Sequence, residues 1–476
     1  MCYLATMRMT ESRMYDRVLA SDASYNGRFF LGVLTTGIYC LPGCGARKPK
    51  RENVCFFPTC DAARAAGLRA CKKCHPDDFA AGADPVLESI ETLVGLVRAR
   101  TKEFCDAKAI VRRSGFGASR VFELFRLHYH QTPADLLAHA RIAHARAALL
   151  AGNTPLTEVA LEAGFESLSV FHDHFRRLTG LTPGDYRKLP QVDSFTVQLP
   201  DGYPLPYLRR ALTRDIHSVT ERLENDHYSC AVRIGDQPAV ISVRLSPECV
   251  HVTAPHDAVA AHRIVIGLLG LNQDAEGFAR LSQKLGLARL VRGRAGLRIS
   301  QTHSVFEGLL WAIIGQQINF PFACQLRRRL IELTGTRLPN GLIAPPAPAD
   351  VAALRSADLV ALKFSRQKAA YVIDTARLIV DGKLTFDSLS ATRAERTLLA
   401  IRGLGPWSVN YLMMRALGFA DCVPYGDTGV TSGLQSLFKL EQRPDVDATR
   451  RLMSVFAPYR SLATAHLWQL NQPQPT

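Results

Sequence analysis

Four cysteines near the start of the chain have the spacing of a metal site. Cys40 and Cys44 form a C-x3-C pair, Cys71 and Cys74 form a C-x2-C pair, and residues 45–70 separate the two pairs. Each pair can hold one metal ion from a tight turn, and four thiolates at such spacing specify tetrahedral Zn²⁺. We therefore expect one zinc ion that stabilises a module too small for a full hydrophobic core and keeps its thiolates reactive.

Positive charge surrounds these cysteines and extends over the whole chain. Basic residues flank both pairs: Arg47, Lys48, Lys50, Arg51, Lys72 and Lys73. The 476 residues carry a formal net charge of +15, and the isoelectric point is near 9.4. A polyanion such as nucleic acid is the partner that this balance favours, although ordinary solvated surface charge is the alternative.

A second set of candidate residues lies in the final third, in the run LLAIRGLGPWSVNYLMMRALGFADCVPYGDTGVTSGL (398–434). Gly403 and Gly405 permit a tight hairpin, and the helix that follows would direct its first N–H groups at a DNA phosphate. Asp427 is either a carboxylate available for chemistry or only the N-cap of the next helix. The chain's three tryptophans, which could equally be core residues, all lie after residue 310.

The elements that must position these residues change character along the chain. The stretch FFLGVLTTGIYC resembles strands, DAARAAGLRA a helix, and residues 85–188 have helical periodicity throughout. Between about 190 and 255 the period changes to two, which predicts a small antiparallel sheet. Helical periodicity returns after 257, with a proline-rich loop expected at 338–350.

These breaks predict four domains, at residues 1–82, 83–188, 190–256 and 257–476. The expected fold class is multidomain and mainly α: a small zinc-bound α/β module, a two-unit helix-turn-helix domain, a small antiparallel α+β domain and an all-α domain. The change of period after Lys188 also leads us to expect that residues from about 190 onward fold alone.

Residues 85–188 contain two candidate helix-turn-helix units. Each has a Gly-Phe turn, at Gly115-Phe116 and Gly164-Phe165, and each is followed by a Thr-Pro element. Second helices of this kind enter the major groove with their N-terminal side chains on base edges. The candidate readers are Ser119 and Arg120 in the first unit and Glu166, Ser167 and Ser169 in the second. A plain helical hairpin is the alternative for either unit alone.

The sequence also indicates in which cellular compartment the protein is found. The first residues lack an apolar secretion segment, and no stretch reaches the ~18 apolar residues needed to span a bilayer. We therefore expect a cytoplasmic, nucleoid-associated bacterial protein with no membrane partner, and we interpret its twelve cysteines as thiols and metal ligands.

Two resemblances sharpen these expectations for the first half. RFFLGVLTTGIYCLPGCGARKPKRENVCFF and AGLRACKKCHP, within residues 15–80, resemble the zinc domain of the Ada adaptive-response family. The resemblance implies four zinc-binding cysteines, Cys40 as acceptor of a methyl group from DNA methylphosphotriesters, and Arg47 as a DNA contact. ALEAGFESLSVFHDHFRRLTGLTPGDYRK resembles the AraC/XylS transcription activators. The Pro-Cys-His-Arg motif of the Ada methylguanine methyltransferase is missing, so repair of O6-methylguanine is not predicted.

The run at 398–434 resembles the helix-hairpin-helix glycosylases of the AlkA type, the 3-methyladenine DNA glycosylases II. The resemblance implies that Gly403 and Gly405 bind DNA and that Asp427 is the catalytic aspartate. Trp407, Tyr411 and Trp468 would line the base pocket, with Gln316 and Gln317 near its mouth. Gln317 replaces an apolar wedge residue of some members. Trp407 stands where bifunctional members have a lysine, so no lyase step is expected. The period-two segment matches the accessory β domain of this group.

Together these observations predict an alkylation-damage sensor and transcription regulator fused to a monofunctional DNA glycosylase. Expected partners are alkylated double-stranded DNA, promoter DNA and RNA polymerase. The alternative is a non-enzymatic activator of the AraC type with an inactive glycosylase-like portion, and the hairpin context of Asp427 favours the enzyme.

Overall fold

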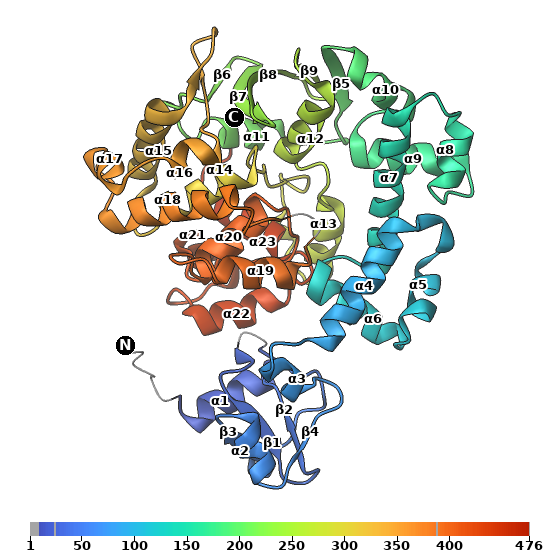
Figure 1. Cartoon of the computed structure of the whole chain (residues 1–476), viewed down its shortest axis with the longest axis vertical. Helices are drawn as coiled ribbons and strands as arrows, with labels where there is room; N and C mark the ends of the chain where they lie inside the picture. Colours follow the sequence, from blue (N-terminus) through green and yellow to red (C-terminus); the bar gives the residue numbers. More distant parts are fainter. Residues whose placement is uncertain (1–8, 23–24, 387–388, 476) are drawn as a thin grey trace. The chain divides into compact units, whose positions relative to one another are not determined.

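The computed structural model describes residues 9–22, 25–386 and 389–475. The chain forms two compact units, residues 1–95 and 96–476 (Figure 1). All eleven described cysteines are free thiols. Within the described ranges, every helix is too short or too polar to cross a bilayer.

The first unit is a small α/β module. Its sheet has the order β3-β1-β2-β4, in which β1 is antiparallel to β2 and β3, while β2 and β4 run parallel. The elements are α1 (Glu11–Leu19), β1 (Phe30–Val33), β2 (Ile38–Cys40), β3 (Val54–Phe57), α2 (Cys60–Ala65), β4 (Arg69–Ala70) and α3 (Pro76–Ala80). The helix expected over DAARAAGLRA ends early, because Gly67 has a φ of +84° and turns the chain into β4.

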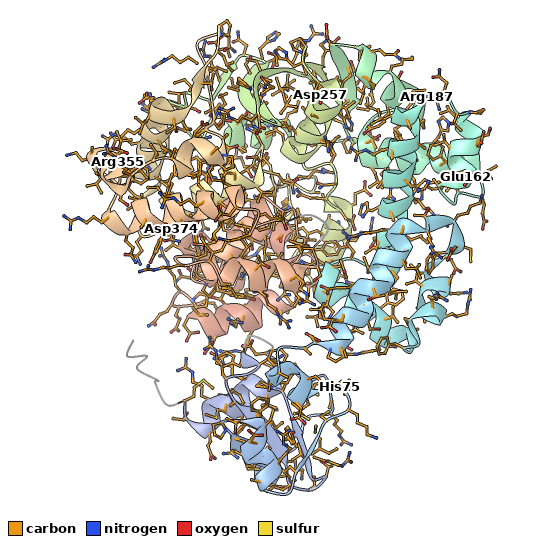
Figure 2. All side chains as sticks on the ribbon, in the orientation of Figure 1. His75, Glu162, Arg187, Asp257, Arg355 and Asp374 are labelled. Atoms are coloured by element: carbon orange, nitrogen blue, oxygen red, sulfur yellow. The ribbon has the colours of Figure 1, made fainter. Side chains whose placement is uncertain are left out.

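Seven helices cover the segment expected to be helical. They are α4 (Pro85–Ala99), α5 (Ala107–Ser114), α6 (Ala118–Tyr129), α7 (Pro133–Ala151), α8 (Leu156–Glu162), α9 (Leu168–Thr179) and α10 (Pro183–Lys188). Both Thr-Pro elements begin helices: Thr132 caps α7 and Thr182 caps α10, with the proline at the first helical position. Charged side chains such as Glu162 of α8 remain exposed on the surface of this part (Figure 2).

The period-two segment forms a five-stranded antiparallel sheet of order β5-β9-β8-β7-β6. Its elements are β5 (Ser194–Gln198), α11 (Leu205–Leu212), β6 (Glu221–Glu224), β7 (His227–Ile234), β8 (Gln237–Leu245) and β9 (Cys249–Thr253), followed by α12 (Ala258–Leu269). In β5 buried and exposed residues alternate, as expected for a strand with one face on a core.

Helices dominate the remainder. They are α13 (Ala275–Lys284), α14 (Val305–Ile314), α15 (Phe320–Thr334), α16 (Pro348–Ala352), α17 (Ser356–Ala361), α18 (Arg366–Val380), α19 (Ala391–Leu399), α20 (Pro406–Arg415), α21 (Thr428–Phe438), α22 (Val446–Ser454) and α23 (Arg460–Leu470). The proline-rich stretch is not wholly a loop, because β11 (Ile343–Ala344) pairs with β10 (Thr336–Arg337) and α16 starts within the stretch. This architecture confirms the expected fold class.

One hydrophobic core crosses the boundary expected near residue 190. It joins Phe171, Phe175 and Tyr186 of the helical segment to the sheet and to α12. Gly180 approaches so closely that an added Cβ would lie 2.4 Å from a methyl of Val197 in β5. The boundaries of the four expected domains stay predictions, but packing is continuous at this one.

Candidate functional sites

The cysteine site is assembled by the parallel pairing of β2 and β4. Tyr39 of β2 lies opposite Ala70 of β4, so Cys40 and Cys71 leave neighbouring strands at the same edge. Each strand then enters a turn that brings back the second cysteine of its pair. Cys44 N–H bonds the carbonyl of Leu41 at 3.0 Å, and Cys74 lies in the turn closed by the bond from His75 N–H to the Cys71 carbonyl.

The four sulfur atoms fit a zinc ion. Their Sγ atoms all lie within 4.8 Å of one another, and tetrahedral Zn–S bonds of about 2.3 Å need sulfurs about 3.8 Å apart. Backbone N–H groups approach the sulfurs: Leu41 N lies 3.4 Å from Cys74 Sγ, and Lys73 N lies 3.4 Å from Cys71 Sγ. Such donors stabilise thiolates, so geometry and surroundings both suit zinc.

Exposure does not single out the expected acceptor. Cys40 is 6% exposed, Cys44 5% and Cys71 8%, whereas Cys74 is only partly buried. The choice of Cys40 as methyl acceptor therefore depends on its place in the sequence motif. Arg47 is exposed three residues beyond Cys44, a position compatible with contact to a phosphate.

Both helix-turn-helix units have the expected turns. Gly115 has a φ of +72° and Gly164 a φ of +93°, values that glycine adopts most easily. At Gly164 a Cβ would also lie 3.2 Å from the Thr101 carbonyl oxygen, so glycine is required there for space as well.

The candidate readers lie at the start of the second helices. Ser119 of α6 and Glu166, Ser167 and Ser169 around the start of α9 are exposed. Arg120 of α6 instead pairs with Glu123 at 2.9 Å. A contact of Arg120 with a base must therefore break or share this exposed ion pair, at a cost of about 1 kcal/mol or less.

The hairpin between α19 and α20 depends on Gly403 more than on Gly405. Gly403 has a φ of +96°, and a Cβ there would lie 2.3 Å from the ring of Tyr371. Gly405 caps α20 with a φ of −98°, which any residue adopts. A Cβ added to Gly405 would meet no atom within 4 Å, so the space around it is open. That space leaves the first N–H groups of α20 accessible, as phosphate binding requires.

Gln316 forms hydrogen bonds to this hairpin, and its expected place near the pocket mouth stays a prediction. Its amide nitrogen donates to the Gly403 carbonyl at 2.7 Å and approaches Ser408 Oγ at 3.0 Å. Gln317, the next residue, is exposed and has a φ of +54°. Sequence comparison alone could not separate the roles of these two adjacent glutamines.

Asp427 is both a helix cap and the centre of a hydrogen-bonded cluster. Its Oδ1 accepts from Val430 N–H at 3.0 Å, which caps α21. The same Oδ1 accepts from Trp468 Nε1 at 2.9 Å, and Oδ2 accepts from Trp407 Nε1 at 3.2 Å. A cap alone does not need two indole donors, so the carboxylate is held in one orientation by groups from three helices.

Aromatic rings extend from this carboxylate. Trp407 and Tyr411 are stacked on α20 with centroids 5.3 Å apart and planes 13° apart, and Trp468 lies 6.4 Å from Tyr411. All three side chains are partly exposed. The structure therefore brings together the predicted residues Asp427, Trp407, Tyr411 and Trp468.

Two arginines at this cluster were missed by sequence reasoning. Burial raises the pKa of Tyr411, but the charges of Arg415 and Arg214 outweigh burial and hold this pKa below its ordinary value. Arg415 lies one helical turn after Tyr411, which a helical reading could have shown. Arg214 lies on the exposed loop after α11, about two hundred residues earlier in the chain, where no spacing signal connects it to Tyr411.

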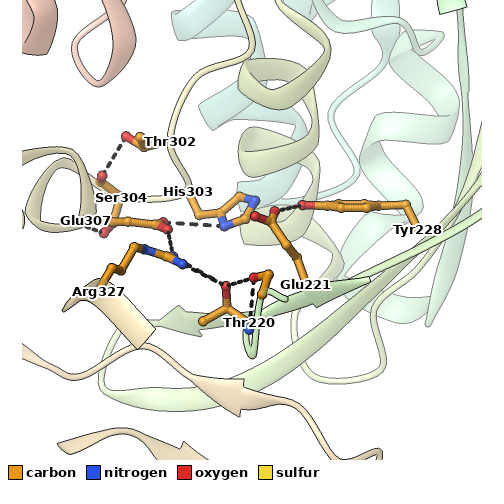
Figure 3. Close-up of polar contacts among 9 residues, drawn as sticks. Thr220, Glu221, Tyr228, Thr302, His303, Ser304, Glu307 and Arg327 are labelled. Atoms are coloured by element: carbon orange, nitrogen blue, oxygen red, sulfur yellow. Dashed lines mark hydrogen bonds and ion pairs between the residues drawn. The ribbon is translucent and has the colours of Figure 1, made fainter. Parts of the chain in front are cut away.

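A buried ion network joins the sheet to the helices near these residues (Figure 3). Glu307 of α14 pairs with Arg327 of α15, and His303 Nδ1 lies 3.4 Å from the same carboxylate. Arg327 also lies 3.3 Å from Thr220 Oγ1, just before β6. Its guanidinium carbon lies 5.0 Å from the ring centre of Trp311, which stacks on Phe320.

Family models match the chain in three places. The metal binding domain of Ada matches residues 13–77, a helix-turn-helix domain matches 110–189, and the HhH-GPD superfamily of base excision DNA repair proteins matches 310–458. These matches confirm the resemblances inferred from the sequence. The chain is a fusion of a zinc-binding Ada domain, a DNA-binding helix-turn-helix domain and a base-excision glycosylase domain.

One similar protein matches nearly the whole chain, and others match more than half of it. The probable bifunctional transcriptional activator/DNA repair enzyme AlkA of Mycobacterium tuberculosis is 27% identical over 481 residues, covering 96% of this chain and 95% of that protein. The DNA-3-methyladenine glycosylase of Bacillus subtilis is 27% identical over 58% of this chain and 97% of its own length. The 3-methyladenine DNA-glycosylase of Archaeoglobus fulgidus shares the fold, with a TM-score of 0.50, 20% identity, and coverage of 58% of this chain and 99% of that one.

Proposed function

We propose that the C-terminal part of this chain hydrolyses the N-glycosidic bond of alkylated purines in double-stranded DNA, 3-methyladenine above all. The observation that carries the proposal is the fixed carboxylate of Asp427 beside the aromatic group Trp407, Tyr411 and Trp468. The similar Bacillus subtilis protein is named a DNA-3-methyladenine glycosylase. A non-enzymatic activator of the AraC type would not need a carboxylate held by two indole N–H groups.

The mechanism follows from charge. Alkylation at N3 or N7 makes the base cationic, and electron-rich ring faces favour such a base once it is flipped from the stack. Cleavage of the bond moves positive charge to the sugar, where the Asp427 carboxylate stabilises it and orients water. Trp407 has no amine to attack the sugar, so we expect a monofunctional enzyme that leaves abasic sites uncut.

DNA contact by this part uses the hairpin. We propose that the open space at Gly405 admits a phosphate to the first N–H groups of α20, with Gly403 setting the turn. We propose that Gln317, which is exposed and has a left-handed backbone conformation, lies at the mouth of the pocket.

Asp427→Asn is the test of catalysis. The asparagine oxygen can still cap α21, but its NH₂ group then faces an indole N–H, so the variant loses both charge and one acceptor. We expect release of 3-methyladenine to fall by roughly 10²-fold or more. Asp445→Asn is the matched control, because Asp445 caps α22 through Ala448 N–H at 2.7 Å and makes no indole contact. Full base release by Asp427→Asn would leave Asp427 as a cap only.

For the first unit we propose one Zn²⁺ held by Cys40, Cys44, Cys71 and Cys74, with Cys40 as methyl acceptor. When bound, the ion keeps the sulfurs as thiolates at neutral pH. A DNA methylphosphotriester is neutral, so the Cys40 thiolate can approach its methyl carbon without repulsion. The sulfur–carbon bond forms as the carbon–oxygen bond breaks, and the phosphate diester leaves with the electron pair.

Methylation of Cys40 removes one negative charge near the exposed Arg47, so promoter DNA should bind more tightly. We propose that Ser119, Arg120, Ser167 and Ser169 then read the promoter, that RNA polymerase is the downstream partner, and that the protein works on the bacterial nucleoid. Affinity measured with and without Cys40 methylation at two salt concentrations tests the charge effect, which must shrink as salt rises.

Labelling identifies the acceptor. Cys40→Ala should take no methyl label from methylphosphotriester DNA, whereas Cys105→Ala, which removes an exposed thiol that is not one of the four ligands, should label fully. Peptide mapping of the labelled wild-type chain gives a second reading. Label on Cys74, the most exposed of the four ligands, would overturn the assignment of Cys40.

A further inference from the structure

The loop at residues 416–427, which joins α20 to α21, ends in Asp427 and therefore sets the place of the candidate catalytic carboxylate. Several elements hold the N–H groups of this loop. Cys422 N–H donates to Ser461 Oγ of α23 at 3.0 Å, and Val423 N–H donates to a side chain of α20. These two bonds stay within the glycosylase domain, whereas the bond before them leaves it.

His130 connects this loop to the first helix-turn-helix unit. The N–H of Asp421 donates to His130 Nδ1 at 3.1 Å. His130 ends α6, the second helix of that unit, in a left-handed conformation with a φ of +55°. Its ring makes an edge-to-face contact with Phe419 of the same loop, with centroids 5.4 Å apart. The first helix-turn-helix unit is therefore docked on the loop by a hydrogen bond and a ring contact.

A second contact joins α6 to α19. The ring of His128, which is buried, has its Nδ1 atom 2.8 Å from Thr392 Oγ1. Thr392 lies near the start of α19, the helix that leads into the hairpin at Gly403. Ser119, a candidate reader, is exposed at the opposite end of α6, so docking leaves it accessible to DNA.

The docked loop reaches the Asp427 carboxylate by a second route as well. The Asp421 carboxylate accepts from Arg460 Nε and Nη2, both at 2.7 Å, which forms a bidentate pair. Arg460 begins α23, and Trp468, about two helical turns later on this helix, donates to Asp427 Oδ1 at 2.9 Å. Asp421 is thus joined to Asp427 both along the loop and through α23.

The charge state of His130 decides whether the unit can dock. An N–H donor needs a lone pair on Nδ1, so the ring must be neutral with its proton on Nε2. Desolvation lowers the pKa of His130 to about 4; Asp421 opposes this effect, and Arg460 and His128 add to it. Docking is complete above the ordinary pKa of 6.5, and its equilibrium constant should fall about tenfold per pH unit from there toward 4.

We propose that the first helix-turn-helix unit positions the active site of the glycosylase domain: through His130 it holds the loop that ends in Asp427, and undocking slows base excision. The inference rests on the glycosylase function proposed above. His130 acts through the loop, so it is a positioning residue, and the effect of its loss should be that of one hydrogen bond. Base excision then depends on the domain that carries the candidate promoter readers, which couples the two halves of the fusion.

Two variants of His130 isolate the bond to the loop. His130→Gly and His130→Asn both accept a left-handed conformation and both lose the ring, but only asparagine keeps an acceptor near the position of Nδ1. In the full zinc-loaded chain, we expect His130→Gly to lower kcat for 3-methyladenine release roughly 3- to 10-fold, with KM little changed. His130→Asn should keep kcat within about twofold of the wild-type value.

Hydrogen exchange measures the docking without any catalysis. The amide of Asp421 should exchange about tenfold faster in His130→Gly than in the wild type, because its acceptor is gone. The amides of Cys422 and Val423 bond inside the glycosylase domain and should keep their rates. After correction for intrinsic exchange, protection of the Asp421 amide should fall as pH decreases from 6.5 toward 4 in the wild type, but not in His130→Asn, which cannot titrate.

His139→Asn is the matched control. The His139 ring lies on α7, where its Nδ1 atom is 3.3 Å from the Gln131 side chain of the same helix-turn-helix segment. This contact does not involve the loop, so the variant should change neither kcat nor the exchange of the Asp421 amide.

The outcomes distinguish this inference from the proposal beneath it. A wild-type chain that releases no 3-methyladenine contradicts the glycosylase function and the inference with it. If the wild type releases the base, an unchanged kcat in His130→Gly, or equal losses of kcat in His130→Gly and His130→Asn, would overturn the positioning role alone. Unchanged exchange of the Asp421 amide in His130→Gly would overturn the docking itself.

Discussion

At the scale of single residues, Asp427 shows how one carboxylate can be both cap and candidate catalyst. Its four lone-pair positions receive three N–H groups, which leaves one position on Oδ2 for a sugar or a water. The indole N–H groups of Trp407 and Trp468 thus orient the Asp427 carboxylate, and this orientation sets the direction in which the free lone pair of Oδ2 points.

Trp468→Phe separates these tasks. The ring face remains, but the donor to Oδ1 is lost, and a hydrogen bond to a charged group is worth about 1.5–3 kcal/mol. We expect kcat for 3-methyladenine release to fall roughly 10- to 100-fold, with KM changed little because the stacking surface is kept. Steady-state kinetics check this split, and a rise in KM at constant kcat would assign Trp468 to base binding alone.

The residues of this site differ in how far the sequence could predict them. Asp427, Trp407 and Tyr411 lie within one short run whose spacing resembles a known family, so their meeting could be expected. Arg214 could not be, because it lies about two hundred residues earlier in the chain, on the loop after α11, where no spacing connects it to Tyr411. Gln316 and Gln317 are chemically identical neighbours, and only the structure shows that the Gln316 side chain bonds to the hairpin while Gln317 is exposed.

At the scale of elements, positioning depends on short turns and on one buried ion network. Periodicity predicted the helical segment that forms α4–α10 and the small antiparallel sheet, since both depend on regular burial. It did not predict β4, whose pairing with β2 gathers the cysteines, because two residues carry no period. The network of Glu307, Arg327 and His303 was also missed, since its charges look like surface residues in the sequence.

This network gives the sheet–helix junction a pH dependence. Burial raises the pKa of Glu307, but Arg327 and His303 outweigh it and lower the value to about 2. The stabilisation that ionised Glu307 contributes is complete above the ordinary carboxyl pKa of 4.5, and it is lost as the pH falls from 4.5 toward 2. The pKa of buried His303 is raised by its acidic neighbours despite desolvation, so its contribution is complete below 6.5 and declines as pH rises through the folded value.

We therefore expect the melting temperature of the C-terminal part to be highest between about pH 4.5 and 6.5 as far as this network contributes. Glu307→Gln should lower stability by about 3 kcal/mol, because it leaves Arg327 buried without its anion. Tryptophan fluorescence is a suitable probe, since Trp311 lies against Arg327. A variant that melts with the wild-type pH profile would show that other groups govern the dependence.

At the scale of the whole molecule, the second helix-turn-helix unit and the sheet are packed as one body. The buried imidazole of His262 in α12 hydrogen-bonds the Thr179 carbonyl at 2.7 Å, and Gln198 N–H donates to the Gly180 carbonyl at 3.0 Å. The sequence suggested a domain boundary near residue 190 because the hydrophobic periodicity changes there from helical to strand-like. A change of periodicity does not show whether the two segments share a hydrophobic core.

Two fragments test what this shared core contributes. A fragment from residue 190 to 476 would expose Phe195, Val197 and Val265 and leave His262 without its carbonyl partner, whereas a fragment from Asp84 keeps α4 and every helix of the shared core. Loss of several buried contacts and one buried hydrogen bond costs roughly 3 kcal/mol or more. We therefore expect the fragment from Asp84, without zinc, to melt cooperatively and to release 3-methyladenine at the rate of the full chain. The fragment from residue 190 should melt at a lower temperature or aggregate. Equal melting temperatures and equal base release from the two fragments would show that the glycosylase part folds without its helix-turn-helix neighbour, and that the core joining them is a contact between separately stable bodies.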